Sequence, residues 1–309
     1  MSTRADRIMG AMVGAAVGDA LGAGYEFGPP LPDNRAVEMI GGGSFGWEPG
    51  EWTDDTSMAI PILRALAAGH TLEVETTLDG VVAEWVGWSR TAKDVGSQTA
   101  SVLGELAVPT AKAARAASRG LHERTGRSAG NGSLMRTAPV SLAKLGDGRE
   151  AELVAVARAV SGLTHFDSDA GDACALWCLA IRHAVRTGDL DLTGQLRWLP
   201  QTSRQRWSEL IVEAEARQPR EFTRNGWVIE ALQGAWSAIV HGDGLVDILE
   251  RAVRGGYDTD TVAAIAGALA GAALGASAVP EQWHATVHGW PGLTADDLAH
   301  LSLRAARFP

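Results

Sequence analysis

The chain has 309 residues, of which 46% are hydrophobic and 21% charged, and its formal net charge at pH 7 is −10. This composition is typical of a globular protein and excludes a disordered chain, while the negative charge argues against nucleic acid as a partner because phosphate binding requires a positive surface. The two cysteines, Cys174 and Cys178, are too few for a tetrahedral zinc site and are expected to be buried.

The first predicted element is a helix near the N-terminus with apolar side chains at helical spacing, namely Met12, Val13, Ala16, Val17, Ala20 and Leu21. The same helix carries a stripe of glycines at every fourth position: Gly10, Gly14, Gly18 and Gly22. A second stripe near the C-terminus consists of Ala263, Gly267, Gly271 and Gly275. An interior glycine destabilises a helix by about 0.5–1 kcal/mol, so a repeated stripe indicates close approach of another helix. We therefore expect the two ends of the chain to pack together in one domain, residues 1–309.

Two segments have features of membrane signals. Residues 1–17 combine basic and apolar positions, but Asp19 and Glu26 follow where a cleavage site would lie. Residues 262–279 are uncharged but mostly alanine and glycine, with Asp260 just before them. We expect both to be buried helices of a cytoplasmic protein that does not bind membranes.

Residues 29–50, 118–132 and 199–226 are predicted to be looser stretches. The first contains Gly41, Gly43 and Gly46, which have the spacing of the dinucleotide-binding motif G-x-G-x-x-G. No strand precedes these glycines and no helix start follows them, so we reject dinucleotide binding and expect a loop above the functional site.

The first acidic cluster is Thr53-Asp54-Asp55-Thr56, directly before the predicted helix 57–68. Aspartate and threonine are favoured as N-cap residues, and the helix dipole stabilises negative charge there. A cap requires only one such side chain, however, and this cluster has four. The excess of oxygen-bearing side chains indicates a function beyond capping.

The middle of the chain has weaker candidates. Gly130-Asn131-Gly132-Ser133 leads into a helical run, and such a turn can present N–H groups to a phosphate, although a tight turn explains it equally well. His165 is a candidate ligand contact, but a lone histidine is more often structural. Glu26 and Asp94 are candidate proton-transfer groups, with a solvated loop residue as the default reading of each.

The second acidic cluster, Asp258-Thr259-Asp260-Thr261, precedes the predicted helix 262–276. If the two clusters meet in the fold, their carboxylates repel one another unless cations lie between them. Oxygen ligands without histidine or cysteine favour Mg²⁺ or Mn²⁺ over zinc. The sequence therefore predicts an all-α protein with a divalent-cation site, because no series of alternating strands is present.

In this order, the motifs resemble those of the ADP-ribosylglycohydrolase family. The resembling stretches, from about residue 8 to 285, are GAAVGDALGAGYEF, PGEWTDDTSMAI, KDVGSQT, GNGSLMRTAPV, LTHFDSDA, NGWVIEAL and GGYDTDTVAAIAGALAGA. The paired TDDT and DTDT motifs are specific, and the glycine-rich pieces support them. The resemblance implies a compact single-domain orthogonal helical bundle with two Mg²⁺ (or Mn²⁺) ions at the base of a cleft.

The resemblance also implies roles for individual residues. The implied metal ligands are Thr53, Asp54, Asp55, Asp258, Asp260 and Thr261. The residues implied to hold the diphosphate and the neighbouring ribose are Ser128, Asn131, Gly132, Ser133 and His165. Glu26 matches the catalytic glutamate of the acceptor-hydrolase branch and Asp94 the aspartate of the bacterial nitrogenase-regulating branch; the KDVGSQT stretch favours Asp94.

The implied activity is metal-dependent hydrolysis of the glycosidic bond between ADP-ribose and a modified protein side chain. Two alternatives remain: hydrolysis of a free conjugate such as O-acetyl-ADP-ribose, and a non-catalytic relative that binds ADP-ribose. The intact acidic clusters count against the non-catalytic alternative. The acceptor linkage stays open. We expect ADP-ribose or an ADP-ribosylated protein as the partner, and a monomer or weak dimer.

Overall fold

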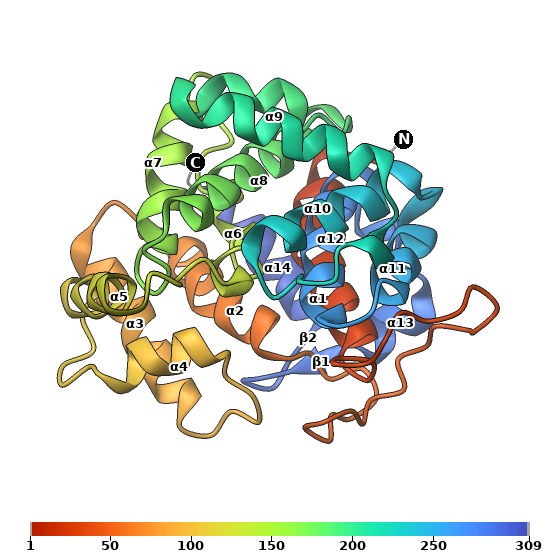
Figure 1. The fold of residues 1–309 in the computed structure, drawn as a ribbon, viewed down its shortest axis with the longest axis horizontal. Helices are drawn as coiled ribbons and strands as arrows, with labels where there is room; N and C mark the ends of the chain where they lie inside the picture. The colour runs from red at the N-terminus through yellow and green to blue at the C-terminus, as the bar shows by residue number, and fades with distance from the viewer. Residues whose placement is uncertain (1, 308–309) are drawn as a thin grey trace.

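The computed structural model describes residues 2–307 and is dominated by helices, as predicted (Figure 1). The helices of the first half are α1 (Arg4–Gly22), α2 (Asp54–Ala67), α3 (Glu75–Ser89), α4 (Ser97–Gly104), α5 (Ala111–Thr125), α6 (Ala138–Leu142) and α7 (Glu150–Ser161). Those of the second half are α8 (Ser168–Thr187), α9 (Gln201–Ala216), α10 (Val228–His241), α11 (Gly244–Arg254), α12 (Thr259–Leu274), α13 (Glu281–Thr286) and α14 (Ala295–Ala305). The ends of the predicted domain, residue 1 and residues 308–309, lie outside the described part.

Short elements complete the chain. Turns of 3₁₀ helix are formed by Asn131–Ser133, Thr193–Trp198, Pro219–Glu221 and Ala276–Ala278. The strands β1 (His288–Gly289) and β2 (Leu293–Thr294) pair antiparallel, with His288 opposite Thr294. This small hairpin is the only sheet within residues 2–307, so the all-α prediction is confirmed.

The centre of the fold is the antiparallel pair α1 and α12, which lie side by side in Figure 1. Gly10 faces Gly271 and Gly14 faces Gly267, and a Cβ atom on any of these glycines would overlap the backbone of the other helix. The predicted contact between the two ends of the chain is therefore confirmed. Because Gly18 faces Ala263 in the same register, the pair also brings Asp19 close to the start of α12.

Two helices begin earlier than predicted. α2 begins at Asp54 rather than at residue 57, and α12 begins at Thr259 rather than at residue 262. Asp54, Asp55 and Asp260 therefore lie in the first helical turns, whereas Asp258 is the N-cap residue of α12. Their carboxylates lie at the positive ends of the helix dipoles, where backbone N–H groups have no partner within the helix.

Two of the predicted loops contain helices. Residues 118–125 belong to α5, and most of the predicted loop 199–226 is α9. α9 was not predicted because its sequence is polar overall. It nevertheless buries Trp207, Ile211 and Ala214 on one face. The spacing of these three residues is that of a single helical stripe.

The two cysteines lie on α8, where both are buried and free, as expected. Within the described residues, no helix has the length and apolar character needed to cross a membrane.

Candidate active site

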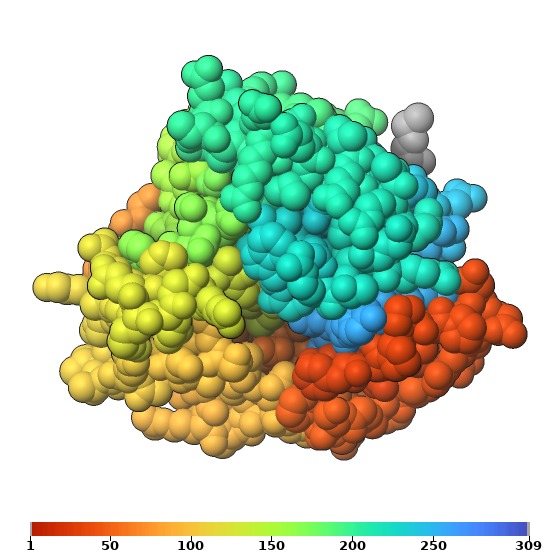
Figure 2. Space-filling view, viewed as in Figure 1, coloured from red at the N-terminus to blue at the C-terminus, as the bar shows by residue number. Residues whose placement is uncertain are grey.

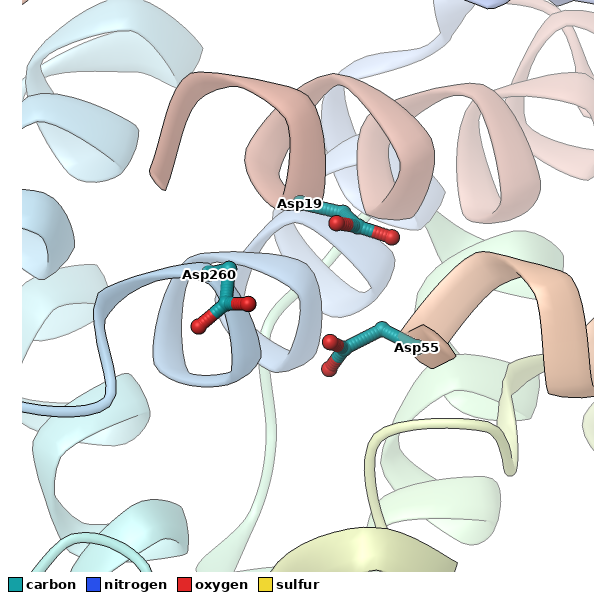
Figure 3. A group of neighbouring side chains, drawn as sticks. All are labelled: Asp19, Asp55 and Asp260. Carbon is teal, nitrogen blue, oxygen red and sulfur yellow. The ribbon is translucent and has the colours of Figure 1, made fainter. Parts of the chain in front are cut away.

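The two acidic clusters meet. The hydroxyl oxygen of Thr261 lies 3.5 Å from Oδ2 of Asp55, a contact between residues 206 positions apart. Carboxylate oxygens of Asp19, Asp55 and Asp260 all lie within 4.8 Å of one another. Figure 3 shows these three side chains converging from α1, α2 and α12. The predicted convergence of the clusters is confirmed.

Asp19 is a site residue that the sequence did not single out. It is fully buried, and its carboxylate accepts hydrogen bonds from the backbone N–H groups of Thr53 (2.8 Å) and Thr56 (3.0 Å). It therefore caps α2 from a neighbouring helix. Thr53, at the N-cap position, makes no cap bond and instead donates to Oδ2 of Asp55 at 2.9 Å. The signal available in the sequence was a single acid in the otherwise uncharged, glycine-striped stretch 8–22 of this helix.

A second carboxylate group adjoins the first. Oxygens of Glu26, Asp258 and Asp260 lie within 4.8 Å of one another, so Asp260 belongs to both groups. Asn131 orients Asp258 by donating from Nδ2 to its Oδ2 at 2.8 Å, and it also donates to the backbone oxygen of Asn225. The predicted turn around Asn131 is thus tied directly to the second acidic cluster.

The carboxylates of the first group are costly to ionise in the absence of cations. Burial raises the pKa of Asp55 and of Asp260 well above the usual range, and repulsion from neighbouring carboxylates raises both further. In each residue, Oδ1 is buried without a hydrogen-bond partner among the described residues. An unpaired buried oxygen is unfavourable, and an all-oxygen donor set is what Mg²⁺ and Mn²⁺ prefer. These residues therefore fit divalent cations.

The second group, Glu26, Asp258 and Asp260, lies in the wall of a cleft of about 430 Å³, and the first group reaches this wall through Asp260. Of the predicted site residues, those in its wall are Glu26, Asp54, Asp94, Asn131, Gly132, His165, Asp258, Asp260 and Thr261. Figure 2 shows a hollow on this face of the molecule, where the N-terminal loop, the segment around α4 and the segment before α10 meet. The structure thus brings residues of both acidic clusters and both candidate proton-transfer groups, Glu26 and Asp94, to one cleft.

Four predicted residues are not in the cleft wall. Thr53 and Asp55 are buried beside it. Ser128 is buried with its hydroxyl 2.6 Å from Nδ1 of His122, and the buried Ser133 accepts a hydrogen bond from Ser161 at 2.9 Å. The two serines therefore support the loop from behind.

A smaller cavity of about 250 Å³ adjoins the cleft. Asp54 and Asp94 are in the walls of both cavities. The indole rings in the smaller cavity are those of Trp47, Trp52, Trp88 and Trp290. Lys93 lies at this cavity, with Nζ 2.6 Å from Glu51 Oε2 and 5.0 Å from the centroid of the Trp47 ring. Tryptophans and the carboxylates of Asp54 and Asp94 thus line this cavity, in which Lys93 already engages Trp47 and Glu51.

Another cavity, of about 770 Å³, lies elsewhere, and its charged lining residues are already paired. These pairs are Arg220 with Asp33, Arg251 with Asp247, and Arg254 with Glu250. We place the functional site in the cleft of about 430 Å³ because its carboxylates are not paired with cationic side chains among the described residues.

The raised pKa values predict how stability depends on pH when cations are removed. Burial and nearby carboxylates raise the pKa of Glu26 from 4.5 to about 9, and burial raises the pKa of Asp19 from 3.8 to about 6. At a pH between the unfolded and the folded pKa of each carboxyl, the folded chain keeps a proton that the unfolded chain has lost. The free energy of unfolding therefore falls as the pH rises. We expect the melting temperature in EDTA to decrease from pH 5 to pH 9, by roughly 2–4 °C per kcal/mol lost.

Excess Mg²⁺ should flatten this dependence, because bound cations favour ionised carboxylates. Thermal unfolding at several pH values, with EDTA and with Mg²⁺, measures both curves. Two parallel curves would contradict the assignment of these carboxylates to one cation-dependent group.

Comparison with known proteins gives a consistent result. A family model described as ADP-ribosylglycohydrolase matches residues 1–307. ADP-ribosylarginine hydrolase Tri1 of Pseudomonas putida (strain GB-1) is 30% identical over 90% of this chain and 73% of its own length. ADP-ribosyl-dinitrogen reductase glycohydrolase of Rhodospirillum rubrum is 29% identical over 90% of this chain and 89% of its own length. A solved structure, an ADP-ribosylglycohydrolase-related protein complex, has a TM-score of 0.75 at 29% identity and covers 100% of this chain and 99% of that one.

Proposed function

The chain belongs to the ADP-ribosylglycohydrolase family and is an ADP-ribosyl hydrolase, and on this premise we propose that it releases ADP-ribose from arginine side chains with the help of divalent cations. The observation that carries the proposal is the convergence of the two acidic clusters in one cleft. A carboxylate-lined cleft repels the anionic diphosphate of ADP-ribose unless cations neutralise it.

Two cations, Mg²⁺ or Mn²⁺, are proposed because there are two carboxylate groups that share Asp260. The residues proposed to hold them are those that the resemblance implies, Thr53, Asp54, Asp55, Asp258, Asp260 and Thr261. Asp19 and Glu26 are added because their oxygens belong to the two carboxylate groups. When bound, such ions supply Lewis acidity and neutralise negative charge. Asn131 fixes the orientation of Asp258, and Asp19 fixes the start of α2, so the chain holds its carboxylates ready for the ions.

The part of the cleft wall formed by the turn at Asn131 and by His165 is proposed to bind the diphosphate and the adjacent ribose. Asn131, Gly132 and His165 are exposed to the cleft there. Ser128 and Ser133 would act from behind by holding the loop, since their hydroxyls bond to His122 and Ser161.

The indole-lined cavity supports arginine as the acceptor. A guanidinium group is planar and cationic, stacks on aromatic faces and pairs with carboxylates. The cavity offers both kinds of partner and adjoins the cleft at Asp94. Its position would let Asp94 exchange a proton with the departing guanidine. The relative from Pseudomonas putida, an ADP-ribosylarginine hydrolase by name, supports the same acceptor.

Asp94→Asn should reduce kcat more strongly than Glu26→Gln. Glu26 lies within a carboxylate group with Asp258 and Asp260, and glutamine keeps one of its oxygens for a cation. Asp94 lies in the walls of both cavities, between the acidic cleft and the proposed acceptor position, so its carboxyl is placed to pass a proton to the departing group. General acid–base assistance contributes about 10²–10⁴-fold, and Asp94→Asn should lose most of it. Steady-state kinetics of both variants decide between them, and a larger loss in Glu26→Gln would reverse the assignment.

The proposed function is tested by incubating the purified protein with three substrates: an arginine-linked ADP-ribosyl peptide, a serine-linked ADP-ribosyl peptide and O-acetyl-ADP-ribose. ADP-ribose release should be fastest from the arginine-linked peptide, should stop in EDTA and should return with Mg²⁺ or Mn²⁺. Preference for O-acetyl-ADP-ribose would favour the free-conjugate alternative. Release that persists in EDTA would refute the cation dependence.

A further inference from the structure

Arg136 is a fully buried cation that the proposed reaction does not use. No carboxylate pairs with it among the described residues. Its guanidinium carbon lies 4.2 Å from the centroid of the Trp85 ring, and Nη1 lies 3.8 Å from the sulfur of Met58. Nη2 donates a hydrogen bond to the hydroxyl of Thr164 at 2.7 Å. An unpaired charge is costly to bury, so this residue is expected to do more than fill space.

The hydrogen bonds of the Thr164 hydroxyl determine which ring nitrogen of His165 carries the proton. The Thr164 hydroxyl lies 2.7 Å from Nδ1 of His165. A guanidinium only donates, so the hydroxyl oxygen accepts from Arg136 and its single proton remains for another partner. Donation of that proton to Nδ1 satisfies both groups. If Nδ1 carried a proton instead, the hydroxyl would accept twice and its own proton would point into a buried region.

A bare Nδ1 places the proton of the neutral imidazole on Nε2. Burial lowers the pKa of His165 well below its usual value, and the charge of Arg136 lowers it further, so the ring is neutral near pH 7. The imidazole of His165 is therefore a hydrogen-bond donor at Nε2 without a full charge.

The Nε2 edge of the ring faces the turn at the cleft. A Cβ atom on Gly130 would lie 3.3 Å from Nε2, and one on Gly132 would lie 3.2 Å from it. Gln98 fixes the surroundings, because its side chain donates to the backbone oxygens of Ser128 and Thr164, both at 3.0 Å, and accepts from the N–H of Gly130. The ring and the turn are thus held in one arrangement, and His165 lies in the cleft wall.

We propose that Arg136 is a positioning residue which, through the hydroxyl of Thr164, holds His165 as the neutral Nε2–H tautomer and so gives the cleft a fixed donor for a substrate oxygen. The tautomer follows from the protein alone. The identity of the oxygen, on the diphosphate or ribose of ADP-ribose, rests on the proposed function.

The test compares Thr164→Val, which removes the hydroxyl at nearly constant volume, with Thr164→Ser, which keeps it. Nitrogen-15 NMR of the protein labelled at histidine identifies which nitrogen of His165 carries the proton, without substrate or cations. The wild type and Thr164→Ser should show a protonated Nε2 and a bare Nδ1, whereas Thr164→Val should populate the Nδ1–H form. A protonated Nδ1 in the wild type, or an unchanged tautomer in Thr164→Val, would overturn the proposal.

Thr137→Val is the matched control, since Thr137 is also a buried threonine and is adjacent to Arg136, but its hydroxyl contacts Cys178. It should leave the tautomer and the kinetics unchanged. In Thr164→Val, KM should rise by about 3–10-fold with little change in kcat, as expected for loss of one ordinary hydrogen bond to bound substrate. A shifted tautomer with an unchanged KM would overturn the role of Nε2 as a substrate donor. Absence of any ADP-ribose release would refute the proposed function. The nitrogen-15 NMR result for the His165 tautomer would still test the positioning role of Arg136 through Thr164.

Discussion

Asp260→Asn is expected to reduce ADP-ribose release by at least about 10²-fold while leaving the fold intact. Asp260 is the residue common to both carboxylate groups, so its replacement weakens both proposed cation positions at once. Electrostatic stabilisation by a bound cation is worth several kcal/mol, and each 1.36 kcal/mol corresponds to about a tenfold change in rate. Initial rates at saturating Mg²⁺ measure this loss.

The same variant should be more stable than the wild type when cations are absent. The asparagine has no charge to be repelled by Asp55 or Glu26, whose carboxylates raise the pKa of Asp260, and its amide can donate to them. The wild type should regain the advantage in Mg²⁺, because a ligand that binds only the folded state stabilises it by about 2.7 kcal/mol at 100 times its Kd. The order of the two melting temperatures should therefore reverse between EDTA and Mg²⁺.

Asp243→Asn is a suitable control for Asp260→Asn. Asp243 is also located at a helix start, that of α11, but it is exposed and its side chain makes no cap bond. Its replacement should change neither the rate nor the response to Mg²⁺. Equal Mg²⁺-induced shifts in the wild type and in Asp260→Asn would show that Asp260 does not bind a cation.

The features that could be predicted from the sequence are residue patterns that are energetically unfavourable unless another part of the chain or a ligand compensates them. Glycines inside a helix are unfavourable unless a neighbour requires them, so the stripe at Gly10, Gly14, Gly18 and Gly22 predicted the α1–α12 pair. Consecutive carboxylates are unfavourable unless a partner neutralises them, so the paired clusters predicted their own convergence.

What the sequence did not reveal depends on side-chain direction and on polar surfaces. Ser128 and Ser133 flank the turn at Asn131 in sequence, but their hydroxyls bond to residues outside the cleft wall, and no local pattern determines which way a turn residue points. α9 has a narrow apolar stripe, so its charged residues were read as a loop. Arg136 was not singled out in the sequence, because only the fold shows that it is buried without an ion pair among residues 2–307.

Gly267→Ala is expected to destabilise the protein by about 3 kcal/mol, the upper end of the usual effect of overpacking. A Cβ atom at this position would overlap the carbonyl oxygen of Gly14 on α1, which is backbone and cannot rotate away. The two helices must therefore separate. Gly80→Ala is the matched control: Gly80 is an exposed position inside α3 with no atom within 4 Å of the added Cβ. This substitution should stabilise the protein by about 0.5–1 kcal/mol.

Identical chemical changes should thus have opposite effects, which urea unfolding of the two variants measures directly. The separation should also reach the active site, because α1 carries Asp19 and α12 carries Asp260, whose oxygens lie within 4.8 Å of a common neighbour, Asp55. Gly267→Ala should therefore weaken Mg²⁺ binding in the fraction that still folds, whereas Gly80→Ala should not. If Gly267→Ala were as stable as the wild type, the close approach of α1 and α12 would not be what sets the spacing of these carboxylates.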